Sequence, residues 1–541
     1  MTLRRYTLAA ILCFAALSLG TGVAAQQGAS ALDQTSAPPL QLSLGDAVRM
    51  GLQNNLDIRV ANYNPQLSEQ DLLVRDAEFD PNFGFLYQKQ DLTSPSINIT
   101  DIGVIDPNDL LDIDSTAETL FALDQEFDNF NFAWFDPLTW GASWEAGMFL
   151  QRAQTSSRNA LVPVTYFSQF QLAYNQSFLR NFGRDANRSQ IIIAQNNYDI
   201  SKSDYRDQVY TSLQQIEDAY WDLVFARQDL EVKRESLGLA GELLKLNRIK
   251  VEVGTLPPIE ITQAEAEVAN REQAVIIAEN AMGDAEDDLR KALNMPKEDN
   301  AWGRPIVPTD EPTFVARAVD LPHELEEAYA NRPDLERARL NLMNADTQMA
   351  LDRNQLRWDL DFRGTYRLQG LAGDDLTVFT ATGPTVLPIN EDFGDSVNRL
   401  ADADFDSWTA QIALNIPVGN NTSQANYLNS RLSREQSSMT YENSRLAAEV
   451  EVRAAARGIL SDQKRIEAAE KNVELQRKKV EAEQKKFENG MSTSFQVLEF
   501  QEDLATALGD LNRALVDYHK SITSLEKAKG TLDKYLNVSV R

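Results

Sequence analysis

Residues 209–251 read VYTSLQQIEDAYWDLVFARQDLEVKRESLGLAGELLKLNRIKV. An apolar residue returns at every seventh position of this stretch, namely Val209, Ile216, Leu223, Leu230, Leu237, Leu244 and Val251. A seven-residue apolar repeat keeps one stripe of a helix against a partner helix along its whole length. The pattern predicts one helix from about Asn187 to Val253, which at 1.5 Å per residue spans about 100 Å. A helix this long is typical of a coiled coil or a helical repeat, not of a compact enzyme.

The apolar row returns later in the chain, which predicts an internal two-fold sequence repeat. Its second copy is Val452, Ile459, Ile466, Val473, Val480 and Phe487. A glycine follows each long helix, Gly254 in the first copy and Gly490 in the second, and is expected to end it in a left-handed conformation. A returning helix is expected after each glycine, and a shorter helix before the long one, at about 44–78 and 321–356.

Between the shorter and the long helix of each copy, apolar and polar residues alternate, as in strands with one apolar face. The apolar positions are Phe83, Phe85 and Tyr87; Phe170, Leu172 and Tyr174; Leu360, Phe362, Tyr366 and Leu368; and Trp408, Ile412, Leu414 and Ile416. A soluble sheet with one wet face uses the same alternation. Two isolated strands per copy are not stable alone, but several chains can pool them into one closed barrel in a membrane.

The first copy is longer than the second by about 41 residues, which must lie within residues 79–186. An extra hairpin, at about Phe130–Trp134 and Ala142–Leu150, is the expected source of this length. The sequence leaves two alternatives for the hairpin: it joins the barrel, or it extends a surface loop.

Composition places the mature chain outside the cytoplasm. Residues 1–25 combine Arg4 and Arg5, an apolar run and a small-residue cleavage site, which together predict a secretory signal peptide. Cys13 is the only cysteine and lies in this segment, so the mature chain has no disulfide or thiolate metal site. A formal charge of −29 excludes nucleic acid as a partner.

No pattern in the sequence predicts an enzyme, a cofactor or a metal site. The two histidines, His323 and His519, have no partner at zinc-ligand spacing. No phosphate-binding glycine motif and no nucleophile motif occurs. We therefore expect no catalytic, cofactor-binding or metal-binding residues.

These features divide the chain into six segments. They are a signal peptide (1–25), a flexible leader (26–40), a first repeat (41–295, with strands in 79–180), a linker (296–319), a second repeat (320–536, with strands in 358–418) and a C-terminal tail (537–541).

The order of these elements resembles the TolC-type outer membrane efflux proteins over about residues 42–536. The resemblance rests on paired segments near the helix starts and strand starts, among them Asn54-Asn55-Leu56-Asp57, Asn331-Arg332-Pro333-Asp334, Phe79-Asp80-Pro81 and Trp358-Asp359-Leu360. It implies a mainly α-helical fold: a periplasmic α-barrel of coiled-coil helices, and a small transmembrane β-barrel to which each chain of a homotrimer gives four strands. It also implies contact with outer membrane lipid, a periplasmic adaptor protein and an inner membrane transporter.

The resemblance also implies two functional regions. An adaptor would dock at the two hairpin turns, which are Val253, Gly254, Thr255 and Leu256, and Asn489, Gly490, Met491 and Ser492. A plain helix reversal is the alternative for both turns. An acidic ring that gates the tunnel would lie at Gln496 and Glu499, although Gln496 departs from the acidic pattern. For Glu499 the alternative is a solvated surface glutamate.

The sequence thus predicts a passive outer membrane exit duct of a tripartite efflux pump or type I secretion system in a Gram-negative cell. The alternative is a soluble periplasmic coiled-coil scaffold or adaptor. Neither the cargo nor the energy source of the pump partner is encoded in these patterns.

Overall fold

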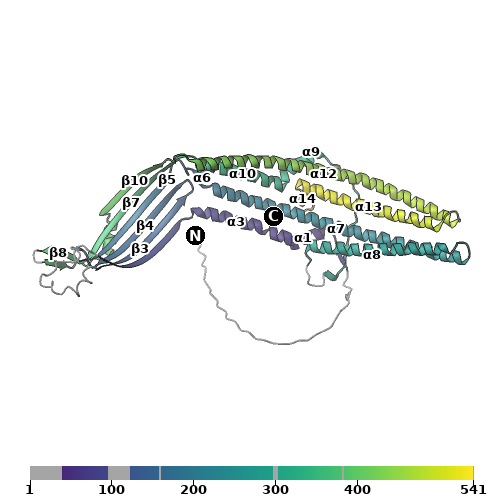
Figure 1. Ribbon diagram of the computed structural model, residues 1–541, viewed down its shortest axis with the longest axis horizontal. Coiled ribbons are helices and arrows are strands. Elements are labelled where there is room, and N and C mark those ends of the chain that lie inside the picture. Colours follow the sequence, from purple (N-terminus) through teal and green to yellow (C-terminus); the bar gives the residue numbers. More distant parts are fainter. Residues whose placement is uncertain (1–38, 96–121, 158–159, 296–301, 381–382, 540–541) are drawn as a thin grey trace, which may run out of the picture.

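The computed structural model describes residues 39–95, 122–157, 160–295, 302–380 and 383–539. The molecule is elongated, with one sheet at one end and long helices that reach to the other end (Figure 1). The signal peptide that the sequence predicts lies outside the described residues.

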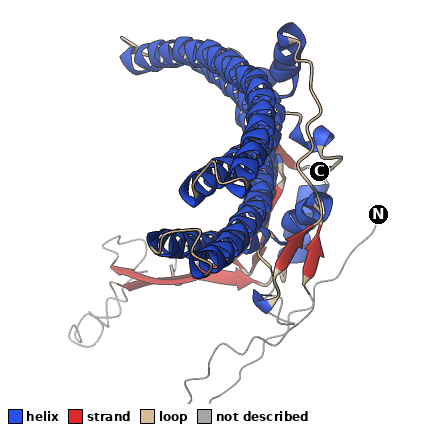
Figure 2. Cartoon of the chain, turned by 90° about the vertical axis from the view of Figure 1, so that its right-hand side faces the viewer, coloured by secondary structure: helices blue, strands red, loops and turns tan. Residues whose placement is uncertain are grey.

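Two long helices and their returning partners form the helical end. Helix α7 (Ser189–Glu252) folds back on α8 (Ile259–Leu293), and α12 (Asn421–Glu488) folds back on α13 (Ser494–Lys529). The heptad residues are their cores: Val209, Ile216, Leu223, Leu230, Val452, Ile459, Ile466, Val473 and Phe487 are all buried. The two hairpins lie side by side in the order α8–α7–α13–α12. Seen end-on, the helices form a curved wall (Figure 2). The mainly helical fold expected from the heptads is confirmed.

The first shorter helix is divided into three, which corrects the single helix expected for residues 44–78. Helices α1 (Leu44–Asn54), α2 (Leu56–Ala61) and α3 (Tyr63–Asp76) follow one another. The first break occurs at Asn55, whose side-chain oxygen accepts hydrogen bonds from two backbone N–H groups of α2. Its amide nitrogen also donates to the Ala292 carbonyl. An Asn that caps one helix must leave the preceding helix, because the cap residue is not helical.

The second shorter helix is divided as well. Helix α9 (Leu321–Asn331) ends before Arg332, and α10 (Pro333–Asn354) begins after it. Arg332 is extended, with ψ 124°, because a residue before proline is disfavoured in the helical region. Near the sheet the wall therefore consists of α3, α7, α10 and α12, packed in that order.

A small parallel pairing braces the middle of the wall. Strand β1 (Leu40–Leu42) pairs with β6 (Ile306–Pro308), which belongs to the linker. Leu42 and Ile306 are buried against Ile216 and Tyr220 of α7. The leader and linker are therefore structured where they meet the helices.

The sheet has six antiparallel strands in the order β10–β7–β5–β4–β3–β2. They are β2 (Asn82–Pro95), β3 (Ala122–Leu138), β4 (Ala142–Thr155), β5 (Val164–Ser177), β7 (Asp359–Asp374) and β10 (Phe405–Asn415). The four strands expected from alternation are β2, β5, β7 and β10. The extra hairpin is β3–β4, and it lies within the sheet between β2 and β5. The sheet of one chain thus has six strands, two more than the four that the resemblance implies.

Short elements complete the described chain. They are a 3-10 turn (Ala77–Phe79), α6 (Arg184–Asn187), the strand pair β8 (Leu376–Thr380) and β9 (Gly383–Leu387), α11 (Phe393–Ala401) and α14 (Leu532–Tyr535). Helix α11 packs on β5 and β7, where Ser396 donates to the Gly370 carbonyl. Within the described ranges, no helix is both long enough and apolar enough to cross a bilayer.

Candidate site at the helical tip

The turn between α7 and α8 is built around one glycine. Gly254 adopts φ +76° and donates to the Val251 carbonyl at 2.9 Å. The N–H and the hydroxyl of Thr255 both donate to the Lys250 carbonyl at 2.8 Å. These bonds satisfy carbonyls at the end of α7 that have no partner within the helix. Val253 stays 69% exposed, so the turn presents an apolar side chain to its surroundings.

The turn between α12 and α13 repeats this design. Gly490 has φ +70°, and the N–H of Met491 donates to the Lys486 carbonyl at 2.8 Å. The Asn489 amide donates to the Lys485 carbonyl at 2.7 Å. Ser492 donates through Oγ to the Glu483 carboxylate, and this bond holds the pKa of Glu483 below its usual range. Met491 is 71% exposed.

The two turns lie at the same end of the molecule (Figure 1). They form one surface because contacts close to the turns join the two hairpins. The Lys250 ammonium of α7 lies 3.9 Å from the Phe487 ring centre of α12. Ser494 at the start of α13 donates to the Glu260 carboxylate of α8. A small core of Ala240, Leu243, Phe487, Val497 and Leu498 fills the space between the hairpins.

Arg271 of α8 links the two hairpins, and its side chain is only 7% exposed. Its guanidinium donates to Ser236 Oγ of α7 at 2.6 Å and to the Leu498 carbonyl of α13 at 2.8 Å. It also pairs with Glu267 at 2.8 Å. A buried guanidinium needs several acceptors in fixed positions, so this contact sets the position of α13 relative to the first hairpin. No motif in the sequence identifies Arg271, since its acceptors come from three helices.

The two predicted gate positions lie in the first turns of α13. Gln496 and Glu499 are both exposed. The Gln496 side-chain amide lies 3.0 Å from Ser492 Oγ, while the backbone N–H of Gln496 donates to Oγ1 of Thr493, the helix N-cap. Within one chain the described residues place Glu499 in no ion pair.

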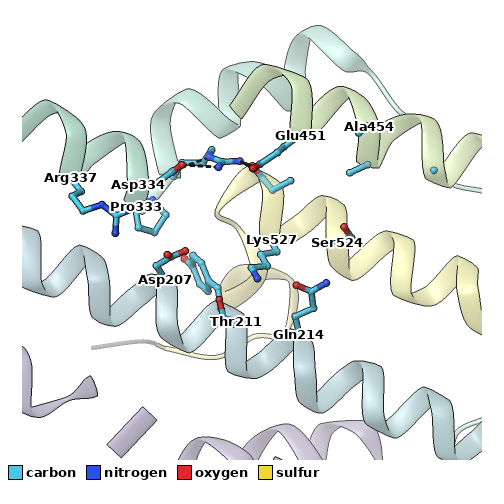
Figure 3. Close-up of a pocket in the computed structure, with 15 residues that line it drawn as sticks. Asp207, Thr211, Gln214, Pro333, Asp334, Arg337, Glu451, Ala454, Ser524 and Lys527 are labelled. Carbon is cyan, nitrogen blue, oxygen red and sulfur yellow. Dashed lines mark hydrogen bonds and ion pairs between the residues drawn. The ribbon is translucent and has the colours of Figure 1, made fainter. Parts of the chain in front are cut away.

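A cavity of about 720 Å³ lies in the middle of the wall, far from the tip, where α10 begins and α13 ends. Figure 3 shows Asp207 and Gln214 of α7 facing Lys527 of α13 across it. Arg332 at its border is fully engaged: it donates to Asp334 at 2.8 and 2.9 Å and pairs with Glu451 at 2.7 Å. Burial would raise the pKa of Asp334, but the bonds from Arg332 outweigh it and lower that pKa. The charged side chains around Arg332 at the cavity border are thus paired with one another and join the helices.

Burial shifts the pKa of titratable side chains between α7 and α13, among them Glu217 and His519. Glu217 of α7 is 1% exposed and accepts a hydrogen bond from Thr523 of α13. Burial raises the pKa of its carboxyl to about 7. His519 stacks on Trp221 with ring centres 4.3 Å apart, and burial lowers the pKa of its imidazole. Among the described residues, no group of three or more metal-ligating side chains is assembled.

Comparison with known proteins identifies the family. The family model for outer membrane efflux proteins matches residues 152–295 and 325–531, which is more than half of the chain. The chain belongs to this family. The first matched segment begins at Arg152, so β3 and most of β4 precede it. A comparison with curated proteins found no match.

Solved structures of outer membrane channels share the fold of this efflux protein. The Campylobacter jejuni CmeC channel is 15% identical, with a TM-score of 0.59 over 90% of this chain and 86% of that one. VceC from Vibrio cholerae is 13% identical, with a TM-score of 0.59 over 90% and 96%. The open state of the Neisseria gonorrhoeae MtrE channel is 15% identical, with a TM-score of 0.58 over 90% and 89%.

Family membership places the efflux protein in the outer membrane of a Gram-negative cell, with its helical part in the periplasm. The family consists of efflux channels, not enzymes. The resemblance to outer membrane efflux proteins, which rests on the paired segments at the helix and strand starts, is therefore confirmed. The docking and gating roles of the tip residues stay predictions, as does the internal repeat.

Proposed function

We propose that this efflux protein is the passive exit duct of a tripartite pump or type I secretion system. Three copies would close into one channel, which a periplasmic adaptor joins to an inner membrane transporter. The observation that carries the proposal is that one copy is an open segment of wall, whose lateral edges lack the partners that their chemistry requires.

The sheet supports this proposal through its two free edges. Within the described residues, β2 pairs only with β3, and β10 pairs only with β7. Backbone N–H and C=O groups at a sheet edge cannot stay unpaired in lipid, so the edges must meet in a closed barrel. Because the sheet has an even number of antiparallel strands, β2 and β10 run in opposite directions. The β2 of one copy can therefore pair antiparallel with the β10 of the next.

The helical wall has matching edges. Helices α3 and α12 are its outer members near the sheet, and each carries a row of exposed apolar side chains. The rows are Tyr63, Leu67 and Val74 of α3, preceded by Val60 of α2, on one edge, and Leu428, Leu432, Met439, Leu446 and Val450 of α12 on the other. Such rows are interface surfaces. A second copy of the chain has the same curvature and would cover the sheet edge and the helix edge at the same time.

In this duct the tip is the docking and gating end. Val253 and Met491 would present apolar contacts to the adaptor, while Gly254 and Gly490 hold the turns tight. Three copies would bring three Glu499 carboxylates around one axis, where they repel one another and attract cations. The soluble scaffold alternative does not account for the apolar face of the sheet.

The docking proposal is tested by placing charge on the exposed tip. The double variant Val253→Lys and Met491→Lys should fold and form trimers normally, because both side chains are exposed. Export should fall at least tenfold, since an ammonium in a desolvated apolar contact costs more than about 1.4 kcal/mol. Export and co-purification of the adaptor are the two measurements.

Val315→Lys is the matched control, because Val315 is 74% exposed in the linker, away from the tip. It should leave export and adaptor binding unchanged. Normal export by the double tip variant would refute docking at these turns.

A further inference from the structure

The β3–β4 hairpin is bonded into the sheet along its whole length. Strand β3 pairs with β2 from Asn82↔Phe135 to Pro95↔Ala122. Strand β4 pairs with β5 from Ala142↔Gln176 to Gln154↔Val164. Strand β3 is the only strand that pairs with β2 within the described residues. The hairpin is thus a structural part of the wall and not a surface appendage.

The hairpin also continues both faces of the sheet. One transverse row crosses all six strands on the apolar face: Phe83, Trp134, Ala146, Leu172, Tyr366 and Trp408. On the opposite face, Gln151 of β4 donates to Asn129 of β3, and Glu145 of β4 pairs with Arg363 of β7 at 3.0 Å. Membrane strands carry this division, with an apolar face toward lipid and a polar face toward the lumen. The hairpin shows this division into an apolar and a polar face at the same depth as the neighbouring strands.

The width of a six-stranded sheet fits the helical wall. Six strands about 4.8 Å apart and tilted by about 40° cover roughly 38 Å of circumference. The four helices that meet the sheet, α3, α7, α10 and α12, cover roughly 36–40 Å at packing distances of about 9–10 Å. Four strands would cover only about 25 Å at the same tilt. With six strands, the wall passes from helices to sheet at nearly constant width.

We propose that the β3–β4 hairpin sets the bore of the channel, so that three copies close an 18-stranded barrel with an open aqueous lumen. This inference rests on the proposed function. Barrel diameter grows roughly in proportion to strand number, so the barrel is about 1.5 times as wide as one of twelve strands. Barrels of 16–18 strands leave an aqueous channel. The lumen is lined by the polar face, including Asn129, Gln151, Gln169 and Arg367.

Deleting residues 122–155 tests the proposal. The deletion removes an even number of strands, so β2 and β5 remain antiparallel and can pair directly. Detergent-purified trimers of the full chain and of the deletion variant are imaged by electron cryomicroscopy. We expect 18 strands in the full chain and 12 in the variant, with a 1.5-fold ratio of circumference. A 12-stranded ring in the full chain, with the hairpin outside it, would overturn the proposal.

Disulfide mapping gives a second measurement that does not depend on the deletion variant. The mature chain has no native cysteine, because Cys13 is the only one. Gln88→Cys on β2 is combined in turn with cysteine at Ser407, Thr409 and Gln411 on β10. One combination should join copies into covalent trimers in native membranes. Cross-linking within one chain, between Cys at 88 and cysteines scanned along the polar face of β5, would instead show that the hairpin is excluded from the wall.

The two levels of inference fail differently. A 12-stranded trimer in the outer membrane with normal export would refute the wide bore but agree with the proposed duct function. A protein with no ring of strands would refute both proposals.

Discussion

At the scale of single residues, Arg271 and Arg332 show how buried charge in the helical wall is paired, since each has partners on several helices. Arg271 and Arg332 each have several acceptors, whereas Glu217 has one hydroxyl donor, Thr523. A buried carboxylate with so little compensation favours its neutral form. Glu217 is therefore one residue whose protonation links folding to pH.

Glu217→Gln should stabilise the protein at high pH and have little effect at low pH. The folded-state pKa of Glu217 is raised from 4.5 to about 7. The stability associated with its neutral form is fully present below pH 4.5 and is lost as the pH rises through about 7. The amide stays neutral, so at pH 8 the gain is about 3 kcal/mol per chain.

Apparent unfolding midpoints at pH 4.5 and pH 8 measure this difference. Glu242→Gln, at an exposed position of the same helix, serves as the control and should behave as wild type. Equal stabilisation by Glu217→Gln at both pH values would contradict the prediction.

At the scale of elements, the two helical hairpins are held together near the tip by one small core and by three polar contacts. These are the contacts of Arg271, the Ser494–Glu260 hydrogen bond and the contact of Lys250 with the Phe487 ring. The α12–α13 hairpin has exposed charge pairs such as Lys479–Asp503, and surface pairs of this kind contribute little. The position of α13 relative to α8 therefore depends mainly on buried contacts.

Arg271→Ala should loosen the start of α13. The change leaves Ser236 and the Leu498 carbonyl without their donor, and loss of one partner from a buried charged contact costs about 3 kcal/mol. Amide hydrogen exchange in residues 494–505 should speed up by roughly 100-fold. Arg248→Ala removes an exposed pair with Glu265 on the same hairpin and should change exchange less than tenfold. Unchanged protection in Arg271→Ala would show that the apolar core alone holds the tip.

At the scale of the whole molecule, an acidic protein is held in a membrane by an apolar band. The formal charge is −29, so electrostatic attraction to anionic lipid is absent. We expect the apolar face of the sheet, which the row from Phe83 to Trp408 crosses, to supply the attachment instead. Attachment of this kind does not weaken when salt screens charge.

We therefore expect the mature protein to sediment with outer membranes and to stay there during a wash in about 1 M salt, which screens charge almost completely. In detergent it should have the mass of a trimer. Release by salt, or recovery in the soluble periplasmic fraction, would favour the scaffold alternative.

The sequence by itself determined the elements whose signals are local. Seven-residue spacing specifies α7 and α12, because each heptad residue must face the same partner helix. Alternation specifies β2, β5, β7 and β10, and Gly254 and Gly490 specify the turns. The helices reverse at the two turns that the sequence predicts, and the docking and gating roles of the tip residues stay predictions.

Tertiary structure alone decided what depends on distant partners. The sequence of the β3–β4 hairpin predicts two amphipathic strands whether the hairpin lies in a surface loop or in the sheet. Only its pairing with β2 and β5 places it in the sheet. The contacts of Arg271 likewise join helices more than 200 residues apart in sequence. Periodicity describes which face of an element is apolar, but it contains no information on which element covers that face. The six-stranded sheet, on which the proposed bore rests, could be known only once those partners were in place.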